Sequence, residues 1–322
     1  MEHPASLALT NGSLMRCKSL RLYVLLGCLL PGHVPALNMS SKETEVAGIL
    51  ETQFTTVVVA GADLLGGKGP YRNLSASVSN ALRLPFAELL AALDSMPGGG
   101  RNEVVKDAVA VVVGAREFRP PSGLGSDQSL NCYVLALNPH ARVDLRRMLV
   151  GVAQAPTDGG FAWTWTAHPT EGHPAPHEFF AIQLAPSYIL VTNNVRDAGA
   201  VARALAPHPG SSARSADGPW RGRSARDIVG VRRRGSGDGG AVSGVDALQL
   251  FVDTRHHEGV LRLVGKGLDA RSAEALSLPV GIRPFGPGKG GALETTFELG
   301  TGEEGVERLV GVWALFGFGL SL

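Results

Sequence analysis

Short apolar runs alternate with Gly- and Pro-rich segments along most of the chain. The runs contain many β-branched residues, and several end at Gly or Pro, which is typical of strands rather than long helices. The expected strands are residues 55–60, 108–118, 132–137, 161–167, 178–184, 188–192, 248–253, 259–264 and 292–299. Residues 178–184 and 188–192 flank Ala185-Pro186-Ser187 and predict a hairpin.

Helical spacing of apolar residues follows several of these strands. We expect helices at residues 85–95, 143–150, 194–206 and 270–276, and a last helix after residue 301. Asn194 is a suitable N-terminal cap, and Thr301 and Glu304 have capping-box spacing. Residues 37–53 are mostly polar and predict a mobile leader.

Hairpins followed by helices predict the α+β class. In this interpretation, antiparallel sheets are built from repeated strand–strand–helix units, and helices pack on one face of each sheet. Residues 37–209 form an N-terminal half and residues 241–322 a C-terminal half. Between them, residues 210–240 are rich in Gly, Ser and Arg and predict a long loop.

The first 36 residues carry the strongest targeting signal. A basic stretch at residues 15–21 precedes an apolar run at residues 22–30, and Val34-Pro35-Ala36 offers a cleavage site. This order is typical of a secretory signal peptide, and the run is too short to span a bilayer. Residues 1–14 are then an upstream extension. Alternatively, Leu25-Leu26-Gly27-Cys28 resembles a lipobox, with Cys28 as a lipid anchor. Both alternatives predict export to the periplasm or cell envelope, and an uncleaved or spurious segment is the third alternative.

Charge and cysteine content exclude some classes of function. The 30 Lys and Arg residues nearly balance the 29 Asp and Glu residues, whereas a dedicated nucleic-acid binder is strongly basic. We therefore expect no nucleic-acid partner. Removal of the signal peptide leaves Cys132 alone in an apolar run, which favours a buried small side chain over a reactive thiol.

The candidate chemistry lies between residues 168 and 178. His168, His173, His177 and Glu178 could hold a zinc ion, and Glu171 or Glu178 could act as its general base. The spacing does not match a zincin helix, because the intervening prolines prevent an i, i+4 pair. A polar hairpin loop is the simpler interpretation.

Two other segments are weaker candidates for a site. Residues 253–258 contain Asp253 and two histidines at the tip of an expected hairpin, where a polar turn is ordinary. Residues 61–69 follow a strand as a P-loop does, but the glycine spacing is wrong and Gly69 replaces the Ser or Thr.

Residues 108–118 (AVAVVVGAREF), 178–205 and 243–254 (SGVDALQLFVDT), together with the signal peptide, resemble exported bacterial proteins of uncharacterised function. In that group a strand–strand–helix unit recurs along the chain. The resemblance implies an envelope location and an α+β fold, and it transfers no functional residues.

The sequence thus predicts an exported periplasmic or envelope-associated protein with a non-catalytic binding or structural role. Its partner would be an envelope protein or a ligand, and no cofactor is expected. Membrane contact would occur only through the signal peptide or the Cys28 anchor. One alternative is a zinc-dependent hydrolase that uses the residue 168–178 cluster. Another is a secreted small-ligand-binding module with a pocket between the two halves.

Overall fold

The structure is a computed structural model that describes residues 41–116, 130–158, 160–167, 177–184, 187–206, 228–234, 244–268, 273–274, 282–300 and 302–318. The strands are β1 Thr56–Gly61, β2 Ala108–Arg116, β3 Leu130–Leu137, β4 Gln154–Thr157, β5 Gly160–Ala167, β6 His177–Leu184, β7 Tyr188–Thr192, β8 Ile228–Arg233, β9 Val245–Asp253, β10 Glu258–Gly265, β11 Gly286–Pro287 and β12 Leu293–Glu298. The α-helices are α2 Ser41–Leu50, α3 Asp63–Gly66, α4 Ala76–Leu82, α5 Ala87–Ser95, α6 Gly100–Asp107, α7 Leu145–Met148, α8 Val195–Leu205 and α10 Glu303–Phe318, with short 3-10 helices η1 Gly69–Asn73, η2 Leu84–Phe86 and η5 Lys289–Gly291.

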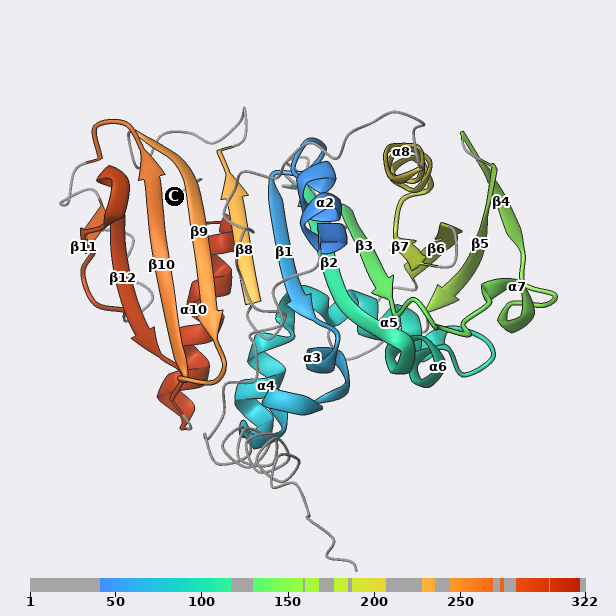
Figure 1. Cartoon of the computed structure of the whole chain (residues 1–322), viewed down its shortest axis with the longest axis horizontal. Helices are drawn as coiled ribbons and strands as arrows, with labels where there is room; N and C mark the ends of the chain where they lie inside the picture. The colour runs from blue at the N-terminus through green and yellow to red at the C-terminus, as the bar shows by residue number, and fades with distance from the viewer. Residues whose placement is uncertain are drawn as a thin grey trace, which may run out of the picture. The chain divides into compact units, whose positions relative to one another are not determined.

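The described strands form one 12-stranded sheet in the order β11-β12-β10-β9-β8-β1-β2-β3-β7-β6-β5-β4 (Figure 1). Every neighbouring pair of strands is antiparallel. The α+β class and the antiparallel sheet are therefore confirmed. Strands from both sides of residues 210–240 belong to the same sheet.

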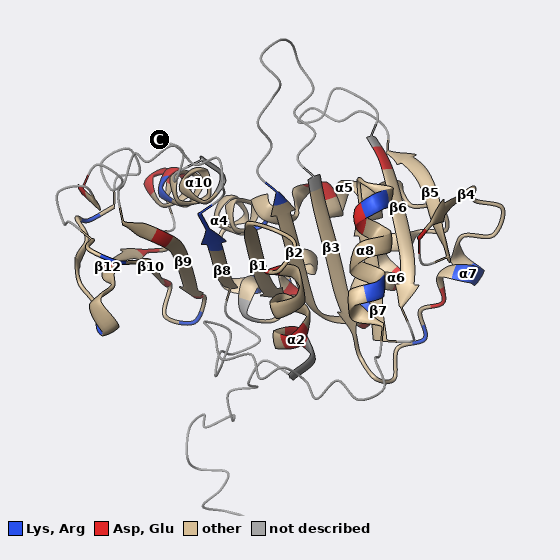
Figure 2. Cartoon of the chain, turned by 90° about the horizontal axis from the view of Figure 1, so that it is seen from above, with Lys and Arg blue, Asp and Glu red and all other residues tan. Residues whose placement is uncertain are grey.

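Helices cover both faces of the sheet, where the sequence pattern predicts one covered face. Helices α4, α5, α6 and α10 pack on one face, and α2 and α8 pack on the other (Figure 2). Successive side chains of β1 therefore enter different clusters: Val58 joins the first and Val59 the second. Because both faces are covered, the central strands are continuous apolar runs without polar alternation.

Residues 41–50 correct the expectation of a mobile leader. They form helix α2, and Val46, Ala47 and Leu50 are buried in the cluster with Val57 and Val59. These three apolar positions share one side of a helix, since they are one and four residues apart. The polar residues around them obscure this short pattern in the sequence.

Residues 228–233 correct the expectation that residues 210–240 are a loop. They form β8, which pairs with β1 on one side and β9 on the other. Gly230 fits here because a Cβ atom would lie 2.8 Å from the Phe316 ring. Arg232 is fully buried and donates a hydrogen bond from Nη1 to the Phe316 carbonyl oxygen. A glycine and two arginines hide this strand from a search for apolar runs.

The remaining predicted helices differ in length or lie outside the described residues. The side chain of Asn194 caps α8 by accepting from the Arg196 N–H at 2.9 Å, as predicted. The helix expected at 143–150 is limited to α7. Residues 1–36, Cys28, Thr301 and most of 270–276 lie outside the described part. Within that part, no helix has the length and apolar character required to cross a bilayer.

Candidate functional site

The predicted zinc ligands are only partly described by the structure. His168 and His173 lie outside the described residues, while His177 begins β6 and Glu178 follows it. Glu178 is exposed, and its Oε1 accepts a hydrogen bond of 2.8 Å from Thr164 Oγ1 on β5. Among the residues with described positions, no group of three or more His, Cys, Asp or Glu residues could hold a metal ion. The zinc site stays a prediction.

Residues 253–258 form the predicted turn between β9 and β10. Asp253 Oδ1 accepts from the backbone N–H groups of Arg255 and His256, and Asp253 Oδ2 lies 2.6 Å from His256 Nδ1. Burial acts to raise the pKa of Asp253, but these hydrogen bonds outweigh it and lower the pKa. His257 has a positive φ of 54°, as a tight turn requires. The cluster stabilises its own turn.

Cys132 is buried on β3, as the apolar run around it predicts. Burial raises the pKa of its thiol, and the nearby Asp197 carboxylate acts in the same direction. The thiol is therefore protonated at neutral pH, and a nucleophilic role for Cys132 is disfavoured.

Among the open hollows of the described part of the molecule, two have similar sizes. The first, which we call the charged hollow, has a volume of about 510 Å³ and lies between α3, α5 and α6. Lys68, Asp94, Arg101, Asn102 and Lys106 supply its polar lining. Three cationic side chains and one carboxylate give it a positive balance.

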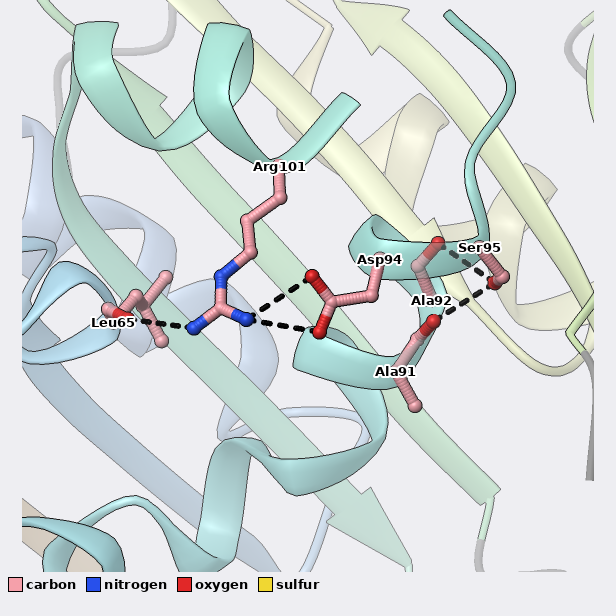
Figure 3. A network of polar contacts seen from close by, with 6 residues as sticks. All are labelled: Leu65, Ala91, Ala92, Asp94, Ser95 and Arg101. Atoms are coloured by element: carbon pink, nitrogen blue, oxygen red, sulfur yellow. Dashed lines mark hydrogen bonds and ion pairs between the residues drawn. The ribbon is translucent and has the colours of Figure 1, made fainter. Parts of the chain in front are cut away.

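Arg101 bridges α5 and α3 beside the charged hollow (Figure 3). Its Nη1 donates to both oxygens of Asp94 on α5, at 3.0 and 2.9 Å, and its Nη2 donates to the Leu65 carbonyl of α3 at 3.4 Å. Arg83 Nε donates to the Leu64 carbonyl at 2.7 Å. Burial, followed by repulsion from Arg101, lowers the pKa of Arg83. The arginines thus satisfy carbonyl groups at the end of α3 and join three segments.

The second hollow, which we call the apolar hollow, has a volume of about 520 Å³ and lies between α7, β4 and β5. Val150 and Phe161 line it with 80% and 66% of their surfaces exposed. Leu149, Val152 and Trp163 also line it, and Arg146 and Gln154 are the polar side chains of a lining that is more polar than apolar overall. The name therefore refers only to the exposed apolar side chains of Val150 and Phe161. Large apolar side chains exposed together are uncommon on a protein surface.

The apolar hollow continues a face that is buried elsewhere. Phe161, Trp163 and Trp165 alternate along β5 and therefore point to the same side of the sheet. Trp165 is 7% exposed under α5 and donates from Nε1 to the Ala92 carbonyl at 3.2 Å. Trp163 is half-buried, and Phe161 extends beyond the helix layer. The core face of β5 is therefore uncovered at its N-terminal end.

Sequence reasoning missed both hollows. Phe161 and Trp163 fall within an expected strand, so their pattern indicates a shared face but not which part α5 covers. Lys68 and Arg101 are far apart in the chain, and their proximity depends on the packing of α6 against α3. The strand order that places β4 at an edge has no local signal.

Comparisons with known proteins leave the family open. Neither a protein-family model nor a curated protein matches the chain. Among solved structures, crystal form I of TP0453 is similar with a TM-score of 0.41 and 13% identity, covering 84% of this chain and 97% of that one. Crystal forms IV and III give TM-scores of 0.38 and 0.39 at 12% identity, with 83% of this chain covered in both and 96% and 97% of those chains. Similarities at this level establish no function for this chain.

Proposed function

We propose that this chain is an exported, non-catalytic binding protein of the cell envelope, and that it contacts its partner through the apolar hollow. The observation that carries the proposal is the joint exposure of Val150 and Phe161 in one hollow. The signal-peptide pattern at residues 15–36 supports export.

Burial of apolar surface supplies the driving force for such contact. Covering a Val or Phe side chain stabilises an assembly by about 1.5–3 kcal/mol. Leu84, Val109 and Val310 are also large and apolar, but each is only 43–46% exposed and none lines the apolar hollow. Isolated apolar side chains of that kind are normal on protein surfaces. The concentration at one end of the sheet therefore favours that end as the binding surface.

The charged hollow supports partner binding less well. Asp94 already neutralises the Arg101 guanidinium with two hydrogen bonds, and the same side chain bonds the Leu65 carbonyl. A ligand that recruited Arg101 would have to break contacts that join α3, α5 and α6. This arrangement favours a structural role for Arg101.

Photo-crosslinking tests the proposal directly. A photoreactive phenylalanine analogue at position 161 of the full chain, expressed in its native host, should capture one recurrent partner in the envelope fraction. The same analogue at position 310, which is exposed at 46%, is the matched control. Equal capture at both positions, or recovery of the protein only from the cytoplasm, would contradict the proposal.

Metal analysis separates this proposal from the hydrolase alternative. Purified full chain without a histidine tag would contain about one equivalent of zinc if His168, His173, His177 and Glu178 formed a catalytic site. Loss of that metal in His173→Ala, together with loss of a hydrolytic activity, would replace the non-catalytic proposal. Under the binding proposal, His173→Ala leaves partner crosslinking at position 161 unchanged.

A further inference from the structure

We propose that the apolar hollow binds an acidic protein segment that presents an apolar side chain beside a carboxylate. This inference rests on the proposed function and specifies the chemistry of the partner. The apolar side chain would contact Val150, Phe161 and Trp163, and the carboxylate would pair with Arg146. The hollow has a volume of about 520 Å³ and is open to solvent, so it suits a projecting side chain better than an enclosed small molecule.

Arg146 supplies the charge that selects the partner. Its side chain is exposed at the hollow, and among the described residues no carboxylate lies within ion-pair distance of its guanidinium. The nearby Asp144 uses Oδ1 to accept the Arg146 backbone N–H and Oδ2 to pair with Arg147 at 3.4 Å. Asp158, beyond β4, pairs with Arg203 at 3.1 Å. The surroundings therefore leave Arg146 available to a carboxylate from outside.

The edge of the sheet disfavours an added strand as the occupant. β4 is the last strand of the sheet, and Thr164 N–H donates to the Ala153 carbonyl. In an antiparallel ladder this places Ala155 and Thr157 in hydrogen-bonded pairs with β5, so the ring nitrogen of Pro156 faces the open edge. A proline there offers no donor to another strand. Recognition by side chains in the hollow is therefore favoured over strand pairing.

Charge also disfavours a second copy of this chain and favours an acidic partner. A twofold contact through the hollow would bring two Arg146 side chains into one interface. The lining residues of the second copy include no carboxylate that could pair with them. An acidic segment satisfies both the apolar lining and the cation.

Fluorescence anisotropy with the full chain provides the test. The probe is a fluorescein-labelled peptide with a central Leu flanked by Asp, and the control peptides carry Lys in place of Asp or Ala in place of Leu. We expect the Asp–Leu peptide to bind, and both control peptides to bind at least about tenfold more weakly. Failure of the Asp–Leu peptide to bind, or equal binding of the Lys peptide, overturns the inference.

Matched variants locate the binding. Arg146→Gln and Phe161→Ser should each weaken peptide binding about tenfold or more, whereas Arg147→Gln and Val310→Ser should leave it unchanged. Arg147 adjoins Arg146 but does not line the hollow, and Val310 is exposed elsewhere. Unchanged melting temperatures show that the variants are folded. Wild-type affinity in Arg146→Gln overturns the inference.

Two further measurements exclude the other occupants. Sedimentation with vesicles of phosphatidylglycerol and phosphatidylcholine that is lost in Phe161→Ser would assign the hollow to lipid. Self-association by light scattering that is lost in the same variant would assign it to a second copy. Either result overturns the acidic-segment inference. Specific crosslinking at position 161 without acidic-peptide binding contradicts only this inference, and absence of both contradicts the proposed function as well.

Discussion

The charged hollow and the apolar hollow have nearly equal volumes, but they differ in whether the side chains that line them have partners within the protein. In the charged hollow, Arg101 is bonded to Asp94 and to the Leu65 carbonyl, so its polar groups already have partners within the fold. In the apolar hollow, Phe161 and Val150 remain largely exposed. The main cation of the charged hollow thus has partners within the protein, whereas the exposed side chains of the apolar hollow would be buried only by a bound partner.

The comparison is tested most strongly on one face of β5. Trp165→Ala should destabilise the protein by about 3–5 kcal/mol, because it empties a site beneath α5 and removes the hydrogen bond to the Ala92 carbonyl. Phe161→Ala should change stability by no more than about 0.5 kcal/mol. Urea unfolding followed by circular dichroism measures both changes. Similar losses in the two variants would mean that Phe161 is a core residue and the apolar hollow is already filled.

A second test changes the glycine turn that separates α5 from α6. Gly98 and Gly99 both have positive φ, at 81° and 75°. A Cβ atom at Gly98 would lie 2.8 Å from the Met148 carbonyl oxygen of α7, whereas at Gly99 nothing lies within 4 Å. Gly99→Ala should cost about 1–2 kcal/mol from backbone strain alone.

Gly98→Ala should cost more, about 2–3 kcal/mol, because the clash with α7 adds to this strain. Thermal unfolding compares the two variants. Since Met148 belongs to α7, which borders the apolar hollow next to Trp163, Gly98→Ala should also alter Trp163 fluorescence when the other three tryptophans are replaced by Phe. An equal cost at both positions would show that α7 moves aside freely.

The smallest expected effect concerns the Arg101–Asp94 pair. Its side chains are 38% and 52% exposed, so solvent screens their attraction. A double-mutant cycle with Arg101→Met and Asp94→Asn should give a coupling energy below about 1 kcal/mol that falls further at high salt. Coupling above about 2 kcal/mol that persists in salt would mean that the charged hollow is drier and more rigid than its exposure indicates.

The sequence predicts the parts of this fold that have local signals. The apolar runs of β1, β2 and β3 are strongly patterned, and the Asn194 cap forms where its position before an amphipathic helix predicts. Helix α2 is missed because three buried residues stand among polar ones, and β8 because Gly230 and Arg232 break its apolar run. In both cases the missing information is tertiary.

The candidate site is less predictable than the fold because it depends on strand order and helix coverage. Periodicity places Phe161 and Trp165 on one face, but only the position of α5 makes one buried and the other exposed. The histidine cluster was visible in the sequence because its residues are adjacent in the chain. Residues brought together by packing, such as Arg146 and Phe161, carry no comparable signal.

The position of β8 has a consequence for the order in which the molecule folds. β1 lies near the start of the chain, yet one of its two edges pairs with β8, which follows about 170 residues later. In this pair Val57 lies opposite Val231. During synthesis that edge of an apolar strand waits for nearly three quarters of the protein to emerge, and such long-range pairing is slow. An exposed apolar edge is a template for aggregation. This strand order therefore leaves one edge of β1 open to pairing with other chains until β8 has been made.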